Sequence, residues 1–172
     1  MTAPAIRTAI PADLERIKAI AVASEMFTVE EVGFFDEILA GFFDRSMQGH
    51  QWLVAEDHSG IVAAAHYAPE PFSDRMWNLY FIAVDPGTQG KGIGALIVSH
   101  VEDTLRSLGE AEARVLIVET SSTQQYARTR DFYAKIGFDE EAQIRQFYGP
   151  GDDKIVFWKS LVANAPGLTH QG

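Results

Sequence analysis

A glycine-rich hexapeptide carries the clearest chemical signal in this sequence: Gln89-Gly90-Lys91-Gly92-Ile93-Gly94. It follows an apolar run from Asn78 to Val84, and an amphipathic segment begins near Ala95. A strand, a glycine-rich loop and a helix are therefore expected in this order. Glycine lets the backbone approach a ligand closely, and the first N–H groups of a helix lack internal partners and carry partial positive charge. The hexapeptide is therefore predicted to hold a phosphate or pyrophosphate group.

Two common phosphate-binding motifs do not fit this hexapeptide. The dinucleotide motif requires G-x-G-x-x-G and an acidic residue about 20 positions later, where this chain has Arg114. The nucleoside triphosphate loop requires Ser or Thr after Gly-Lys, and here Gly92 follows Lys91. A purely structural loop is the remaining alternative. Closely spaced glycines cost conformational entropy on folding, which favours a ligand-binding loop.

Length and composition predict one soluble domain over residues 1–163, followed by a flexible tail at 164–172. Apolar residues make up 47% of the 172-residue chain, which is enough for a sizeable core. There is no membrane-spanning run and no signal peptide pattern, so we expect a cytoplasmic protein. The absence of cysteine excludes disulfides, thiolate zinc ligands and a cysteine nucleophile. The formal net charge of −10 disfavours nucleic acid and anionic membranes as partners.

Apolar periodicity predicts the order strand, two helices, three strands, helix, strand, helix, two strands. The strands are expected at 5–9, 51–56, 61–67, 76–84, 114–120, 138–147 and 154–161, and the helices at 11–21, 30–46, 92–108 and 123–136. Hairpins at both ends of a strand–helix–strand centre predict an α/β (α+β) fold. Its sheet is expected to be mixed and mostly antiparallel, with six to seven strands and about four helices on both faces. The hairpins exclude a doubly wound parallel sheet.

Two motifs together resemble the GNAT superfamily of N-acetyltransferases. The segment Ile82 to Pro86 and the hexapeptide after it are similar to the acetyl-coenzyme A motif of that family, Gln/Arg-x-x-Gly-x-Gly/Ala after a strand. The segment Asp131 to Phe138 resembles the family's second motif, an aromatic pair followed by Gly-Phe. Tyr133 follows Gly94 by 39 positions (133 − 94), which is within the family's usual range. The resemblance covers residues 78–161 and implies a GNAT-like fold.

The resemblance also implies the co-substrate, acetyl-coenzyme A, without a metal. The loop would bind the pyrophosphate through its backbone N–H groups, and the pantetheine arm would lie along the edge of the preceding strand. One amide there would polarise the thioester carbonyl. The expected cofactor-binding residues are Ile82, Ala83, Val84, Gln89, Gly90, Lys91, Gly92, Ile93, Gly94 and Ala95.

Two residues are predicted to be catalytic because of the resemblance. Val118-Glu119-Thr120 is similar to the strand end of ribosomal-protein N-terminal alanine acetyltransferases, which implies that Glu119 is the general base. Tyr133 would protonate, or hydrogen-bond, the departing thiolate. A strand-end carboxylate and a core tyrosine are the corresponding structural alternatives. Family members use an Asn before this helix to contact the cofactor, and residues 121–126 contain none.

The acceptor is predicted to be a primary amine on a small molecule or at a peptide N-terminus. By resemblance, Tyr148 in the last hairpin would hold the acceptor, and Glu25 would attract its ammonium group. The five histidines lack metal-ligand spacing, and no Gly-x-Ser-x-Gly suggests a serine hydrolase. Two alternatives stay open: a non-catalytic sensor or interaction module that binds acyl-coenzyme A, and an enzyme with a longer acyl donor. A homodimer is common among similar proteins.

Overall fold

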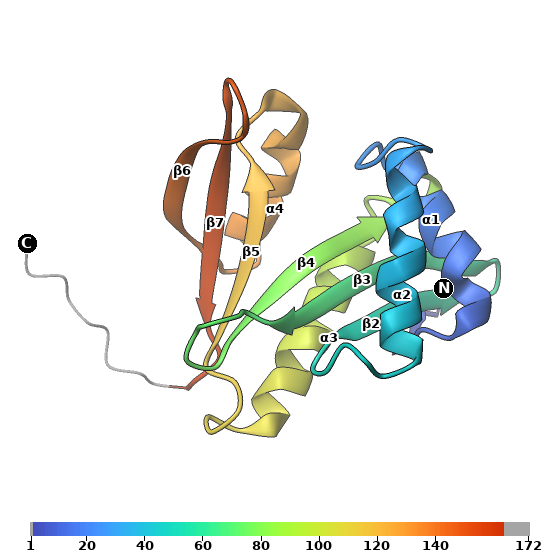
Figure 1. The fold of residues 1–172 in the computed structure, drawn as a ribbon, viewed down its shortest axis with the longest axis horizontal. Coiled ribbons are helices and arrows are strands. Elements are labelled where there is room, and N and C mark those ends of the chain that lie inside the picture. Colours follow the sequence, from blue (N-terminus) through green and yellow to red (C-terminus); the bar gives the residue numbers. More distant parts are fainter. Residues whose placement is uncertain (1, 164–172) are drawn as a thin grey trace, which may run out of the picture. The chain divides into compact units, whose positions relative to one another are not determined.

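The computed structural model describes residues 2–163, and the predicted tail at 164–172 lies outside these residues (Figure 1). The described chain forms a mixed α/β fold with the expected order of seven strands and four α-helices. The elements are β1 (Ala5–Thr8), α1 (Leu14–Ala23), α2 (Phe35–Phe43), β2 (Gln51–Asp57), β3 (Gly60–Pro69), β4 (Met76–Val84), α3 (Ile93–Leu108), β5 (Val115–Ser121), α4 (Ala127–Lys135), β6 (Asp139–Gly149) and β7 (Asp152–Ser160). Short 3₁₀ helices precede α1, α2 and α4, and another lies at Pro86–Thr88.

The chain divides into two compact units, which are described separately. The first contains residues 2–69 and 78–101, and the second contains residues 70–77 and 102–163. Strand order is β1-β2-β3-β4 in the first unit and β5-β7-β6 in the second. The pairs β1–β2, β2–β3, β5–β7 and β6–β7 are all antiparallel, which confirms a mostly antiparallel sheet. That residues 1–163 act as a single domain stays a prediction.

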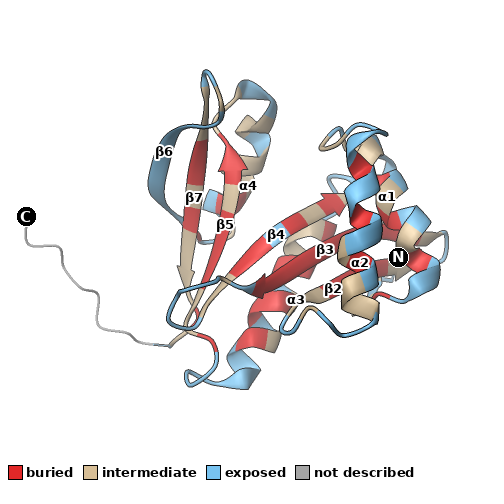
Figure 2. Ribbon diagram, in the orientation of Figure 1, coloured by how far each residue is buried: buried red, intermediate tan, exposed pale blue. Residues whose placement is uncertain are grey.

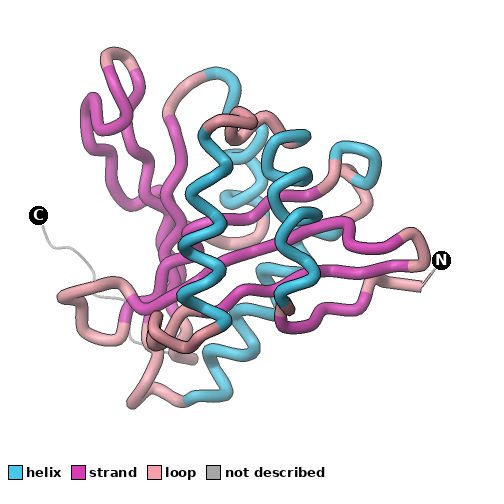
Figure 3. The backbone as a smooth tube through the Cα atoms, turned by 45° about the vertical axis from the view of Figure 1, so that its right-hand side comes forward, coloured by secondary structure: helices cyan, strands magenta, loops and turns pink. Residues whose placement is uncertain are grey.

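The first unit buries its strands on both faces. Strand β3 is buried without interruption from Ile61 to Ala68, as expected for a strand covered on both sides (Figure 2). Helices α1 and α2 run side by side across one face, and the first half of α3 lies on the other (Figures 1 and 3). Helix α2 packs here through Phe35 and Leu39, which are buried in the same core cluster as Trp52.

The second unit has its own core between α4 and the β5–β7 strands. Leu116, Ile117 and Val118 of β5 are buried. Lys159 of β7 pairs with Glu102 of α3, with Nζ and Oε1 2.7 Å apart. Strand β6 forms the edge of this unit and is exposed along almost its whole length.

None of the helices within residues 2–163 combines the length and the apolar character needed to cross a bilayer.

Candidate functional site

The glycine-rich loop connects the end of β4 to the start of α3, as the sequence predicts. Gly90 and Gly92 have φ angles of +80° and +77°, in the left-handed region that glycine adopts without strain. A Cβ atom placed on either residue would meet no protein atom within 4 Å. The backbone at these two positions is therefore open toward a ligand, and packing against the protein does not explain the glycines.

The start of α3 presents N–H donors that take no part in the backbone hydrogen bonds recorded for residues 2–163. Leu96 is the first residue of α3 with a helical hydrogen bond, from its N–H to the Gly92 carbonyl at 3.0 Å. The N–H groups of Ile93, Gly94 and Ala95 precede this bond, and as the first N–H groups of the helix they have no intrahelical acceptor. They form the positive end of a 16-residue helix dipole. A phosphate or pyrophosphate group fits this arrangement.

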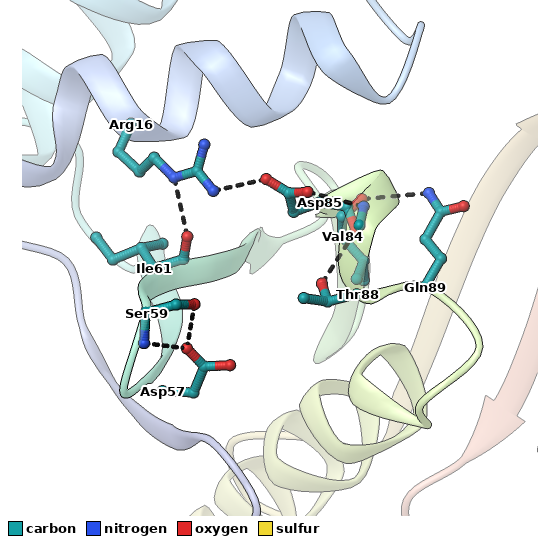
Figure 4. A network of polar contacts seen from close by, with 9 residues as sticks. Arg16, Asp57, Ser59, Ile61, Val84, Asp85, Thr88 and Gln89 are labelled. Carbon is teal, nitrogen blue, oxygen red and sulfur yellow. Dashed lines mark hydrogen bonds and ion pairs between the residues drawn. The ribbon is translucent and has the colours of Figure 1, made fainter.

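Asp85 and Arg16 fix the entrance of the loop (Figure 4). One carboxylate oxygen of Asp85 accepts the Gly87 N–H at 2.9 Å, and the other pairs with Arg16 Nη2 at 2.6 Å. Arg16 Nε also donates to the Ile61 carbonyl at 2.9 Å. The hydrogen bond from Gly87 and then the Arg16 guanidinium lower the pKa of Asp85. One guanidinium thus joins α1, β3 and the loop.

The side chain of Gln89 turns back toward the strand that precedes it (Figure 4). Its Nε2 donates to the Val84 carbonyl at 3.2 Å, so the side chain closes the loop. Ala83 is buried, whereas Ile82 and Val84 are partly exposed. Lys91 is exposed. Its charge contributes to the lowered pKa of Asp57, which is caused mainly by hydrogen bonds from Ser59.

Glu119 in the second unit pairs with a buried lysine, Lys154, which no sequence motif had singled out. Lys154 Nζ lies 3.2 Å from Glu119 Oε1, and the two side chains are 10% and 24% exposed. The register pairs Ser121 with Lys154 and Glu119 with Val156. Glu119 and Lys154 are therefore diagonal neighbours on one face of the β5–β7 ladder.

Two aromatic residues of β6 complete this cluster. The Lys154 ammonium lies 3.5 Å from the centre of the Phe147 ring, which contacts the Tyr148 ring edge to face at 5.0 Å. Burial raises the pKa of Tyr148 to about 12, with further contributions from the charges of Glu119 and Asp152. The structure thus brings Glu119 and Tyr148, two predicted site residues, into the same cluster.

Asp153 holds the irregular part of β6 that carries these two rings. Its carboxylate accepts the backbone N–H of Gln146 at 2.8 Å and the side-chain amide of Gln143 at 2.5 Å. Gln146 has a φ of +55°, and the β6–β7 register shifts between Ile144 and Gly149. The pKa of Asp153 is lowered, first by the Gln146 hydrogen bond. This anchor determines where Phe147 and Tyr148 emerge from the strand.

Tyr133 lies on α4 and is buried among aromatic rings. Its ring centre is 5.7 Å from that of Phe138 and 5.5 Å from that of Phe157, and the residue is 2% exposed. Burial raises the pKa of the phenol far above its usual value of 10.0. The phenol therefore stays protonated at any physiological pH, which favours a hydrogen-bond donor over a proton donor.

Hydrogen bonds from hydroxyl groups and an arginine hold the segment between β5 and α4, residues 121–126, which contains no Asn. Ser121 Oγ donates to Asp152 Oδ1 at 2.5 Å and lies 2.8 Å from Thr123 Oγ1. Arg130 Nη1 donates to the carbonyls of Ser121 and Thr123 at 2.7 and 2.8 Å. These bonds join β5, α4 and the start of β7.

The remaining predicted acceptor residue, Glu25, follows α1 in the first unit. It is exposed, and its backbone has a φ of +61°.

A separate hollow of about 530 Å³ occurs where α2 leads into β2, between Phe42 and Gln51, and none of the predicted site residues lines it. Beside it, His50 Nδ1 and His66 Nε2 are 2.9 Å apart, and His66 stacks on Trp52 with ring centres 4.6 Å apart. No group of three or more His, Asp or Glu side chains in residues 2–163 could hold a metal ion.

The amino-acid sequence is similar to proteins of a known family. Residues 48–140, more than half of the chain, match the family model described as the acetyltransferase (GNAT) domain. The mycothiol acetyltransferase of Beutenbergia cavernae is 32% identical over 106 residues, which are 62% of this chain and 33% of that protein. The chain spans about a third of the length of the mycothiol acetyltransferases that it matches.

Solved structures show the same fold. A protein from Desulfovibrio desulfuricans assigned to the GNAT family of acetyltransferases is 31% identical, with a TM-score of 0.83 over 92% of this chain and 99% of that one. The phosphinothricin acetyltransferase of Sinorhizobium meliloti, solved with acetyl-coenzyme A, has a TM-score of 0.72 at 22% identity, over 93% of this chain and 89% of that one. At this lower identity the likeness shows the fold alone.

Proposed function

The chain belongs to the GNAT family of acetyltransferases, and from this premise we propose that it transfers the acetyl group of acetyl-coenzyme A directly to a primary amine. The assignment of acetyl-coenzyme A as the acetyl donor rests on one observation, the geometry of the loop from Gln89 to Ala95. Its left-handed glycines leave the backbone open, and its helix presents free N–H donors, which suits a pyrophosphate. In this proposal the edge of β4 from Ile82 to Val84 binds the pantetheine arm.

The reaction needs a neutral amine and a leaving thiolate. The amine nitrogen attacks the thioester carbonyl carbon, a C–N bond forms, and the C–S bond breaks. We assign Glu119 as the base that takes the proton released by the amine. We assign Tyr133 as a donor of a hydrogen bond to the sulfur, because burial keeps its phenol protonated. The thiolate finally takes up a proton to give free coenzyme A.

Direct transfer is favoured over a two-step reaction by composition. The chain contains no cysteine, so a cysteinyl acyl-enzyme is excluded. The relationship to mycothiol acetyltransferases supports acetyl as the transferred group, and it covers only part of those proteins.

The test is release of free thiol from acetyl-coenzyme A in the presence of a panel of small amines and short peptides. We expect amine-dependent thiol release by the purified chain. Tight binding of acetyl-coenzyme A with no turnover of any amine would contradict the proposal and support a non-catalytic sensor. A panel of longer acyl donors, run in parallel, shows whether acetyl is preferred.

A further inference from the structure

Lys154 is a buried cation with an unused hydrogen-bond donor. The residue is 8% exposed, and its ammonium group has three N–H donors. Among residues 2–163 its partners are the Glu119 carboxylate at 3.2 Å and the face of the Phe147 ring at 3.5 Å. These account for two donors. A buried donor without a partner is costly, so the third N–H is suited to an oxygen atom supplied by a ligand.

The position of this donor relative to Glu119 suggests which ligand oxygen it binds. Glu119 is the proposed base, so the acceptor nitrogen must approach its carboxylate. In an α-aminoacyl group, standard bond lengths place the nitrogen and the carbonyl oxygen roughly 3 Å apart. This matches the 3.2 Å between Lys154 Nζ and Glu119 Oε1. One such group can therefore reach the carboxylate with its nitrogen and the ammonium with its oxygen.

We propose that the acceptor is an α-aminoacyl compound, such as an amino acid amide or a peptide N-terminus, whose carbonyl oxygen accepts a hydrogen bond from Lys154. The inference rests on the proposed acetyltransferase function and narrows its acceptor. A lysine side chain or a simple alkylamine offers nitrogen without an adjacent carbonyl oxygen. Such amines leave the Lys154 donor unpaired and are poorer acceptors.

The surroundings of Lys154 agree with this class of acceptor. Its positive charge and the negative charge of Glu119 compensate each other, so the pair does not select a strongly cationic acceptor. The rings of Phe147 and Tyr148 remain 53% and 47% exposed, which leaves apolar surface for the side chain next to the amine. Lys154 acts on the acceptor oxygen, where no bond is made or broken.

The test compares two acceptors that differ at one group. Alaninamide and 2-aminobutane both carry an amine and a methyl group on one carbon, but only alaninamide has the carbonyl. Rates are compared per neutral amine. We expect wild-type kcat/KM to be at least roughly tenfold higher for alaninamide, the value of one charge-assisted hydrogen bond. Lys154→Met should lower kcat/KM for alaninamide roughly tenfold more than for 2-aminobutane, while Lys154→Arg should restore part of the preference.

Lys159→Met is the matched control, because Lys159 lies on the same strand and pairs with Glu102. It should leave the preference unchanged. Equal wild-type use of both amines, or an equal loss on both in Lys154→Met, would overturn the inference while leaving the acetyltransferase function intact. Failure of every amine would overturn both. Folding of Lys154→Met is checked by circular dichroism and acetyl-coenzyme A binding. If this variant does not fold, the preference for alaninamide over 2-aminobutane in wild type and in Lys154→Arg tests the inference instead.

Discussion

Arg16 and Asp85 are 69 positions apart in sequence, yet Nη2 of Arg16 lies 2.6 Å from Oδ2 of Asp85. The same guanidinium binds the Ile61 carbonyl, so helix α1, strand β3 and the glycine-rich loop share one anchor. Because this anchor ties the loop entrance to α1 and β3, we expect it to favour the open, left-handed conformation of the loop. Binding of acetyl-coenzyme A should therefore depend on a residue outside the loop motif.

Arg16→Met should weaken binding of acetyl-coenzyme A severalfold, because the loop entrance loses its tie to α1 and β3. The side chains of this ion pair are 43% and 24% exposed, so the change in unfolding free energy should be only about 0.5–1 kcal/mol. Isothermal titration calorimetry and thermal melts measure both. Lys18→Met is the control, because Lys18 pairs from the same helix with Asp36. Equal affinity in wild type and Arg16→Met would argue against the anchor.

Gly90→Ala and Gly92→Ala should each weaken binding of acetyl-coenzyme A roughly tenfold and lower the unfolding free energy by about 1 kcal/mol. The φ angles of +80° and +77° disfavour a side chain, and a new methyl group would project into the open space proposed for the ligand. Gly33→Ala serves as the control. The φ of Gly33 lies outside the left-handed region, and a Cβ atom placed there would also meet no protein atom within 4 Å. If the loop variants bind the donor like wild type, the loop is not the pyrophosphate site.

Glu119→Gln should lower kcat/KM by roughly 10² to 10⁴, the usual contribution of a general base, and leave donor affinity unchanged. The amide keeps the shape of the side chain and can still accept a hydrogen bond from Lys154. Glu140→Gln, on exposed strand β6, should have no effect. Steady-state kinetics with one amine at saturating donor distinguish the two variants. A wild-type rate in Glu119→Gln would remove this residue from the mechanism.

Acidification should destabilise the first unit through His66. Burial lowers the pKa of His66 from 6.5 to about 3, with a smaller contribution from the charge of His50. The unfolded chain therefore binds a proton below pH 6.5 that the folded chain does not, and stability is lost as pH falls from 6.5 toward 3. Between pH 7 and pH 4.5 the loss from this residue should be roughly 2–3 kcal/mol.

His66→Phe keeps a ring stacked on Trp52 and removes the titrating group. Its unfolding free energy, measured by urea denaturation, should fall less steeply with acidification than that of wild type. His58→Gln, in the exposed β2–β3 turn, should follow the wild-type slope. Identical slopes for wild type and His66→Phe would show that His66 does not resist protonation.

The sequence was sufficient to predict the fold and the loop. Period-two and helical patterns locate every strand and helix to within a few residues, because these patterns report local burial. The glycines at positions 90 and 92 signal an unusual backbone without knowledge of the rest of the fold. Irregular starts of helices, such as the 3₁₀ turns at Glu31–Phe34 and Gln124–Tyr126, were predicted as continuous helix, because they share the same apolar spacing.

The residues that support the site could not be predicted. Lys154 lies near the start of strand β7 and has no motif around it, and only the β5–β7 register places its ammonium beside Glu119. From the sequence alone, Arg16 is expected to be an exposed helix residue, and only the fold shows that it pairs with Asp85. Such contacts depend on pairing between distant segments, which a single sequence does not specify.

The most direct measurement follows a labelled acetyl group. The protein is incubated with acetyl-coenzyme A labelled in the acetyl group and with a peptide that has a free N-terminal alanine, and both peptide and protein are then analysed by mass spectrometry. We expect the label on the peptide nitrogen, an equal amount of free coenzyme A, and no label on the protein. Label that remains in acetyl-coenzyme A bound to the protein, with no acetylated product from this peptide or from any amine of the panel, would contradict the account.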